Sequence, residues 1–168
     1  AVVFEEINGK INVVGEHVES FKTSVEDTTE EEFLVAIDKA VSLAEKNLPP
    51  DVESHKTVFG VKQDWTEDGK IKPEYLAKLK KVSDELEFQP MGFLVIPEAI
   101  GHLLQKQEGA PLTAVLAEIG KKSVTLSLFK AGRILETKSG PLGESIISTV
   151  EDLLKNFSAT ETLPPRII

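Results

Sequence analysis

The strongest constraint on the fold is the alternation of short β-type runs with longer segments of helical periodicity. The continuous apolar run 93–96 is typical of a strand that is buried on both faces of a sheet. The apolar residues of 73–86, in contrast, recur at helical spacing. Strands that alternate with helices predict an α/β protein with a mixed sheet and helices on both of its faces. Within that sheet we expect residues 93–96 and 112–118 to be adjacent central strands.

Turn residues and helix signals divide the chain further. Asn8-Gly9 between two apolar runs predicts a hairpin, and the capping-box spacing of Thr28 and Glu31 predicts the start of a helix. The element order is β-β-β-α-β-α-β-α and then β-β-β-α, in a single domain 1–168 with a first half 1–107 and a second half 108–168. The predicted strands are 1–6, 10–15, 17–25, 56–61, 93–96, 112–119, 123–129 and 133–138, with a strand-like stub at 166–168.

Composition excludes several classes of function. The chain has 168 residues and a net charge of −9, with 19 basic and 28 acidic side chains. This balance argues against nucleic-acid binding, which needs clustered lysine and arginine. No uncharged apolar run is long enough to span a membrane. The absence of cysteine excludes disulfides and sulfur-ligated metals and fits a cytoplasmic protein.

Three passages of the chain carry a resemblance to a known family. Residues 113–126 stand where that family has a strand, an Asp-Ile-Gly-Gly-Gly-Thr turn and a second strand. Residues 129–135 and 140–143 follow like its next hairpin and its Pro-x-Gly helix start, and residues 94–100 resemble the preceding strand and helix. The chain thus resembles the actin-like ATPase superfamily, and most closely the bacterial division protein FtsA and the pilus-assembly protein PilM. The resemblance implies an actin-like (ribonuclease-H-like) fold.

The same resemblance implies a degenerate phosphate-binding turn. In the family, a carboxylate at this turn positions a Mg²⁺-bound water, and glycines let backbone N–H groups approach the phosphates. Here Glu118 replaces the aspartate, Gly120 is the one remaining glycine, Lys121 and Lys122 fill the other positions, and Ser123 replaces the threonine. The turn either still cradles an anion or is an ordinary hairpin turn with solvated lysines.

The family's first phosphate turn and its adenosine-binding stretch would lie before residue 1 and after residue 168, so this chain does not contain them. The resemblance therefore implies a non-catalytic scaffold or assembly module that binds other proteins and has no catalytic residue, metal or cofactor. The alternative is an active ATPase that binds ATP and Mg²⁺ through further motifs outside this chain.

Three other features bear on possible binding sites. Trp65, the only tryptophan, could anchor a partner or cover the core. The three histidines, His17, His55 and His102, are too dispersed for a metal pair. The acidic run 26–32 matches the preference of a helix dipole for acids in its first turn.

Overall fold

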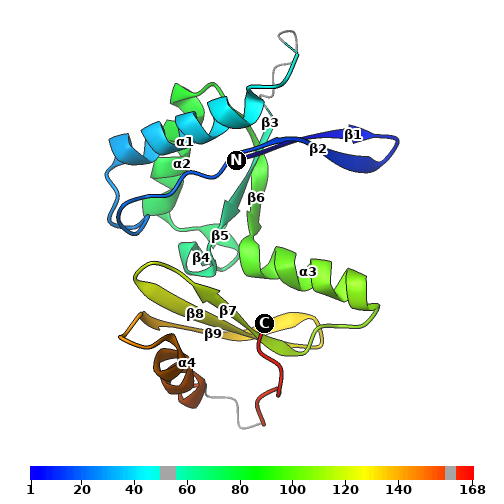
Figure 1. Ribbon diagram of the computed structural model, residues 1–168, viewed down its shortest axis with the longest axis vertical. Helices are drawn as coiled ribbons and strands as arrows, with labels where there is room; N and C mark the ends of the chain where they lie inside the picture. The colour runs from blue at the N-terminus through cyan, green and yellow to red at the C-terminus, as the bar shows by residue number, and fades with distance from the viewer. Residues whose placement is uncertain (50–55, 158–161) are drawn as a thin grey trace. The chain divides into compact units, whose positions relative to one another are not determined.

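The structure is a computed structural model that describes residues 1–49, 56–157 and 162–168 (Figure 1). Pro50 and His55 lie outside the described residues. The chain forms two compact units, Ala1–Phe59 with Glu67–Gly92 and Gly60–Thr66 with Phe93–Ile168. The elements are β1 (Val2–Ile7), β2 (Lys10–Glu16), α1 (Glu30–Glu45), β3 (Lys56–Val61), a 3₁₀ turn η1 (Gln63–Trp65), β4 (Thr66–Glu67), β5 (Lys70–Ile71), α2 (Pro73–Glu85), β6 (Gln89–Val95), α3 (Ile96–Glu108), β7 (Ala114–Ile119), β8 (Ser123–Lys130), β9 (Arg133–Pro141) and α4 (Ile146–Lys155).

The first unit begins with the hairpin predicted from Asn8-Gly9. Both turn residues have a positive φ, 53° at Asn8 and 74° at Gly9, which is the backbone that a two-residue hairpin turn requires. A bulge shifts the register between Val3 and Phe4. At the base of the hairpin, Gly15 lies directly against the backbone of Ala44 in α1. This close approach fixes which face of the hairpin packs on the helix.

The predicted third strand at residues 17–25 is wrong, because the structure describes all of these residues and gives them turns and irregular backbone. The ring of Phe21 stacks on that of Phe33 in α1, with 5.8 Å between the centroids. The Thr28 hydroxyl donates to the Ser24 carbonyl (2.9 Å). These contacts hold the segment against α1 instead of the edge of the hairpin.

Helix α1 begins one residue later than predicted. The capping box is formed by Thr29 and Glu32, not by Thr28 and Glu31, because the hydroxyl of Thr28 is already engaged in the preceding turn. Helix α2 contacts the segment just before α1 through Lys78, whose ammonium donates to the Thr28 carbonyl (3.1 Å). Glu30, Glu31 and Glu32 occupy the first turn of α1, as the helix-dipole interpretation of the acidic run predicts.

Strands β3 and β6 form a two-stranded sheet, and β4 pairs with β5. The prediction that 93–96 is buried on both faces is wrong, since Phe93 and Leu94 are 37% and 42% exposed and Val95 alone is buried among the residues of β6. A continuous apolar run indicates a strand, but it does not determine how many neighbours that strand has.

The second unit is built on the three-stranded antiparallel sheet β7-β8-β9. Helix α4 covers one face of this sheet and α3 the other (Figure 1). Successive side chains of the central strand β8 point to opposite faces of the sheet. The core toward α4 contains Val115, Val124, Leu126, Leu128 and Leu153; the core toward α3 contains Leu112, Ala114, Leu116 and Phe129.

The free edge of β7 is occupied by the C-terminal segment, which confirms the strand-like stub. Ile167 pairs in parallel with Val115, and Ala117 donates its N–H to the Ile168 carbonyl (2.8 Å). The guanidinium of Arg166 donates two hydrogen bonds to the Glu108 carboxylate, at 2.7 and 3.0 Å. Strand β6 therefore does not neighbour β7, and the prediction that 93–96 and 112–118 are adjacent in one sheet is wrong. The sheets are small and separate, in a mixed α/β protein.

Candidate functional site

The hairpin between β7 and β8 brings the five predicted site residues together. Glu118 precedes the end of β7, Gly120 to Lys122 form the turn, and Ser123 starts β8. The Gly120 N–H donates to the Ser123 carbonyl (2.8 Å), and the Lys122 carbonyl accepts from the N–H of Leu142 (2.7 Å). A phosphate-binding turn needs unengaged backbone N–H groups, and the N–H of Gly120 is already used inside the hairpin.

The backbone of this turn differs from that of a glycine-rich phosphate loop. All four residues from Gly120 to Ser123 lie within the described part of the chain, and all have a negative φ. Lysine is compatible with this backbone, since only a positive φ strongly favours glycine. The side chains of Lys121 and Lys122 are exposed. The geometry is therefore that of an ordinary tight hairpin turn.

Glu118 lies in a different environment from the rest of the turn. It is half-buried on the sheet face toward α3, directly opposite Thr125 of β8, which is opposite Ser139 of β9. The hydroxyls of Thr125 and Ser139 are 2.9 Å apart. Burial raises the pKa of Glu118; the Asp64 carboxylate raises it further, and the Lys62 ammonium opposes the shift. A carboxyl in this setting keeps its proton to a higher pH than a fully exposed one does.

Sequence reasoning missed this polar row and its neighbours. Asp64 and Lys62 precede Glu118 by more than fifty residues, so no local sequence pattern connects them to it. The polar residues of the row leave a weak signal, because Thr125 and Ser127 alternate with apolar residues along β8. Ser127 is fully buried on the same face, 3.4 Å from the Thr137 hydroxyl. Within the described residues, no group of three or more histidines, cysteines or acids could hold a metal ion.

We expect Glu118→Gln to stabilise the protein at neutral pH. The pKa of Glu118 is higher in the folded than in the unfolded chain, so its ionisation disfavours folding as the pH rises from the unfolded pKa, about 4.3, through the folded pKa. The glutamine side chain removes this penalty. Urea unfolding should show a higher midpoint for the variant at neutral pH and no such gain below pH ~4.

Asp64→Asn is the matched background for this test. Without the Asp64 carboxylate the pKa of Glu118 is less raised, so Glu118→Gln should gain less stability there. A difference between variant and parent that is independent of pH would contradict the raised pKa.

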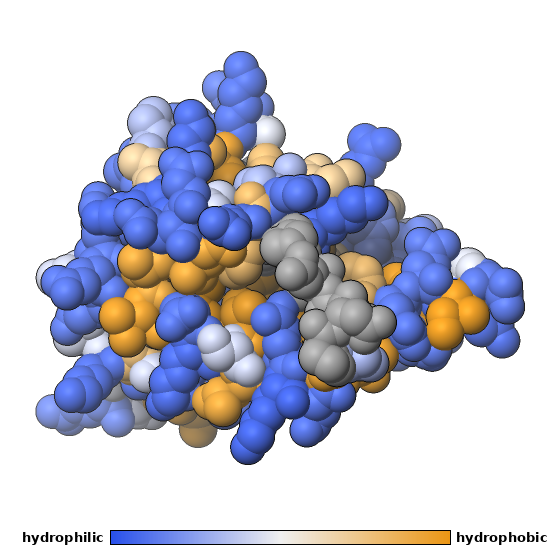
Figure 2. Space-filling model, turned by 90° about the horizontal axis from the view of Figure 1, so that it is seen from above, coloured by the Kyte–Doolittle hydropathy of each residue, from blue (hydrophilic) through white to orange (hydrophobic). Residues whose placement is uncertain are grey.

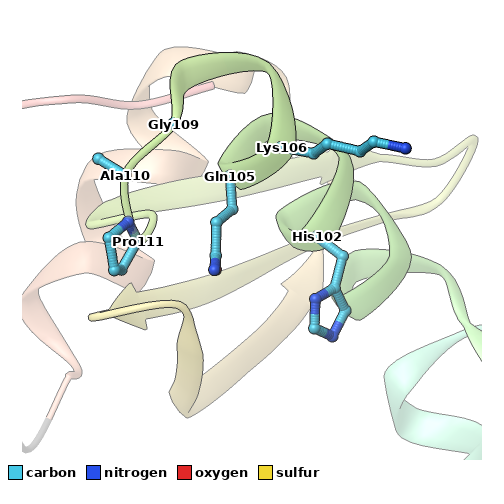
Figure 3. Close-up of a pocket in the computed structure, with 6 residues that line it drawn as sticks. All are labelled: His102, Gln105, Lys106, Gly109, Ala110 and Pro111. Atoms are coloured by element: carbon cyan, nitrogen blue, oxygen red, sulfur yellow. The ribbon is translucent and has the colours of Figure 1, made fainter.

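A hollow of about 480 Å³ lies in the second unit, at the end of α3 and the start of the segment that leads into β7 (Figure 3). Figure 3 shows His102, Gln105 and Lys106 extending from α3 and Pro111 closing the other side. None of the five predicted site residues lines it. The turn is at the opposite end of β7 and thus roughly 17 Å away along the strand.

The structure also places Trp65 and two of the three histidines. Trp65 is 5% exposed, so it belongs to the core and does not anchor a partner. The His17 imidazole lies 3.0 Å from the Glu19 carboxylate, and His102 borders the hollow. Among the helices that the structure describes, none has the length and apolar character needed to cross a membrane.

Comparison with solved structures gives a distant likeness. No family model and no curated protein match the chain. Among solved structures, the chain resembles the crystal structure of ethanolamine utilization protein EutJ from Carboxydothermus hydrogenoformans, with 15% identity and a TM-score of 0.47. The match covers 76% of this chain and 41% of that one, so the chain spans about two fifths of the EutJ structure. A likeness at this level does not determine the family.

Proposed function

We propose that the second unit is one half of an actin-like (ribonuclease-H-like) domain and that the chain is a non-catalytic scaffold or assembly module. The element order of this unit supports the proposal. Three antiparallel strands lead into a helix, and a last segment returns parallel to the first strand. The three strands and the start of the helix are among the passages on which the resemblance to FtsA- and PilM-like proteins rests. A cytoplasmic location and protein partners are parts of the same proposal.

One observation carries the non-catalytic part of the proposal. The Gly120 N–H, the donor that a phosphate would need, is bonded to the Ser123 carbonyl across the hairpin. Binding a phosphate there would require breaking this backbone hydrogen bond. Leaving the Ser123 carbonyl without its donor would cost about 1 kcal/mol or more. The exposed side chains of Lys121 and Lys122 could attract an anion, but without directed backbone donors that attraction is screened by salt.

The alternative function, part of an active ATPase, has one observation in its favour. Glu118 occupies the strand position where the resemblance places the carboxylate for the Mg²⁺-bound water, and the Asp64 carboxylate acts on it. Against this, the raised pKa of Glu118 disfavours the ionised form that Mg²⁺ requires.

We expect Mg-ATP to leave the melting temperature of this chain unchanged. A ligand that binds only the folded state at one hundred times its Kd stabilises by about 2.7 kcal/mol, which would shift the melting temperature by several degrees. Differential scanning calorimetry with ~1 mM Mg-ATP therefore detects binding with a Kd of ~10 µM or tighter.

Two variants separate the possible causes of a positive result. Lys121→Ala with Lys122→Ala tests whether a signal depends on the two charges of the turn. Glu118→Gln tests whether it depends on the carboxylate. Micromolar binding that Glu118→Gln abolishes would overturn the scaffold proposal and favour the ATPase.

A further inference from the structure

The hairpin β1–β2 has two faces of different character. Along each strand successive side chains point to opposite faces, and the register pairs Phe4 with Val13 and Glu6 with Ile11 on one of them. Glu5, opposite Asn12, lies on the other. Val3 and Gly15 also belong to that second face, which packs on α1 where Gly15 meets the backbone of Ala44.

The first face has four large apolar side chains, which the described residues of the first unit leave largely exposed. Their exposed fractions are 59% for Val2, 54% for Phe4, 68% for Ile11 and 59% for Val13. In Figure 1 the hairpin extends well beyond α1, and Figure 2 shows hydrophobic side chains among hydrophilic ones on this projecting part. We name these four residues the open face. A contiguous exposed apolar patch of this kind marks an interaction site, and a hairpin of two strands is only marginally stable without further packing.

The charged residues beside the open face favour a basic partner over a second copy of this chain. Glu16 lies opposite Val2 and Glu6 opposite Ile11, so a carboxylate flanks each end. The hairpin's one lysine, Lys10, pairs with Ile7 on the other face, and the amino terminus donates to the His17 carbonyl (2.7 Å). Two copies stacked through their open faces would bring these glutamates together, which costs free energy through like-charge repulsion. A basic partner has the complementary charge.

We propose that the open face binds an amphipathic helix of a partner protein, with an apolar stripe flanked by a lysine or arginine at each end. The two strands together are about 10 Å wide, which is the width of one helix. The glutamates are four residue pairs apart, or roughly 13 Å, so basic residues about seven or eight positions apart, which share one face of a helix, would lie near them. This inference is independent of the phosphate turn, because it rests on the first unit alone.

The test uses two synthetic helices of roughly 18 residues, long enough to be helical in water. Both carry the same leucine stripe; one has lysines at the flanking positions and the other has glutamates there. Fluorescence anisotropy at physiological salt should show at least about tenfold tighter binding of the lysine-flanked helix. Glu6→Lys should reduce this preference.

Two matched variants locate the binding face. Ile11→Thr on the open face should weaken binding about tenfold or more. Ile7→Thr, on the other face of the same hairpin and 49% exposed, should leave it unchanged. Both replacements keep a β-branched side chain, so strand propensity is preserved. Circular dichroism checks that both variants are folded.

Three results would overturn the proposal. The first is equal affinity for the two helices. The second is an equal loss of binding in Ile7→Thr and Ile11→Thr. The third is a dimer, detected by analytical ultracentrifugation, that Ile11→Thr dissociates, since the occupant would then be a second copy.

Discussion

Gly15→Ala is expected to lower the free energy of unfolding by about 3 kcal/mol, at the upper end of the cost of overpacking. A methyl group at this position would overlap the carbonyl oxygen of Ala44 in α1. Ala44 is itself buried, and the clash involves backbone, so no side-chain rotation can relieve it. The hairpin and α1 must separate. Urea unfolding followed by circular dichroism measures the loss.

Gly60→Ala is the matched control for this substitution. A methyl group there would meet the side chains of Ile96 and Leu94 at 3.5 and 3.7 Å, which are ordinary van der Waals distances. Alanine also restricts the unfolded chain, so we expect no loss and a gain of up to ~1 kcal/mol. Equal losses in Gly15→Ala and Gly60→Ala would contradict the proposed clash between the methyl group and α1.

Gly101→Ala is expected to destabilise the second unit by about 2 kcal/mol, although alanine is a better helix former than glycine by about 1 kcal/mol. The added methyl would lie 2.5 and 2.9 Å from two ring atoms of Phe129. That ring is 1% exposed and packs with Leu112 and Leu116, so it has little space to move. Overpacking therefore outweighs helix propensity.

A double-mutant cycle with Phe129→Leu tests this mechanism. The smaller side chain makes room for the methyl group, so Gly101→Ala should cost less in the Phe129→Leu background than in the parent. The expected coupling is at least ~1 kcal/mol, within the range for residues in direct contact. Additive effects in urea unfolding would contradict the proposed contact between α3 and the ring.

Local turn chemistry made some elements predictable from the sequence. Asn8-Gly9 fixed a hairpin because its two residues readily adopt a positive φ, and both do so. Gly132, between the predicted strands 123–129 and 133–138, likewise has a positive φ in the turn that joins β8 and β9. These signals depend only on neighbouring residues, and the structure confirms them.

Strand neighbours could not be predicted in the same way. The apolar run 93–96 and the β7 run have similar compositions, yet β6 pairs with β3 while β7 lies between β8 and the C-terminal segment. Which strands pair depends on contacts between distant residues, and hydrophobicity alone does not encode them. The same limit explains the error at residues 17–25, where stacking of Phe21 on Phe33 competes with strand pairing.

For the candidate site, the place of the turn was predictable and its chemistry was not. Glu118 and Gly120 to Ser123 are close in the sequence, so any hairpin brings them together. The hydrogen bond from Gly120 to Ser123 and the effect of Asp64 on the pKa of Glu118 arise only in the folded chain. Whether the five site residues bind a nucleotide stays a prediction.

The parallel pairing of Ile167 with Val115 has a consequence for the chain while it is being synthesised. Because translation proceeds from the N-terminus, β7, β8 and β9 can assemble on the ribosome before residues 166–168 emerge. Throughout that interval the outer edge of β7 presents unpaired N–H and C=O groups, a template for pairing with other nascent chains. Once the segment has arrived, the two hydrogen bonds between Arg166 and Glu108 help to hold it against this edge.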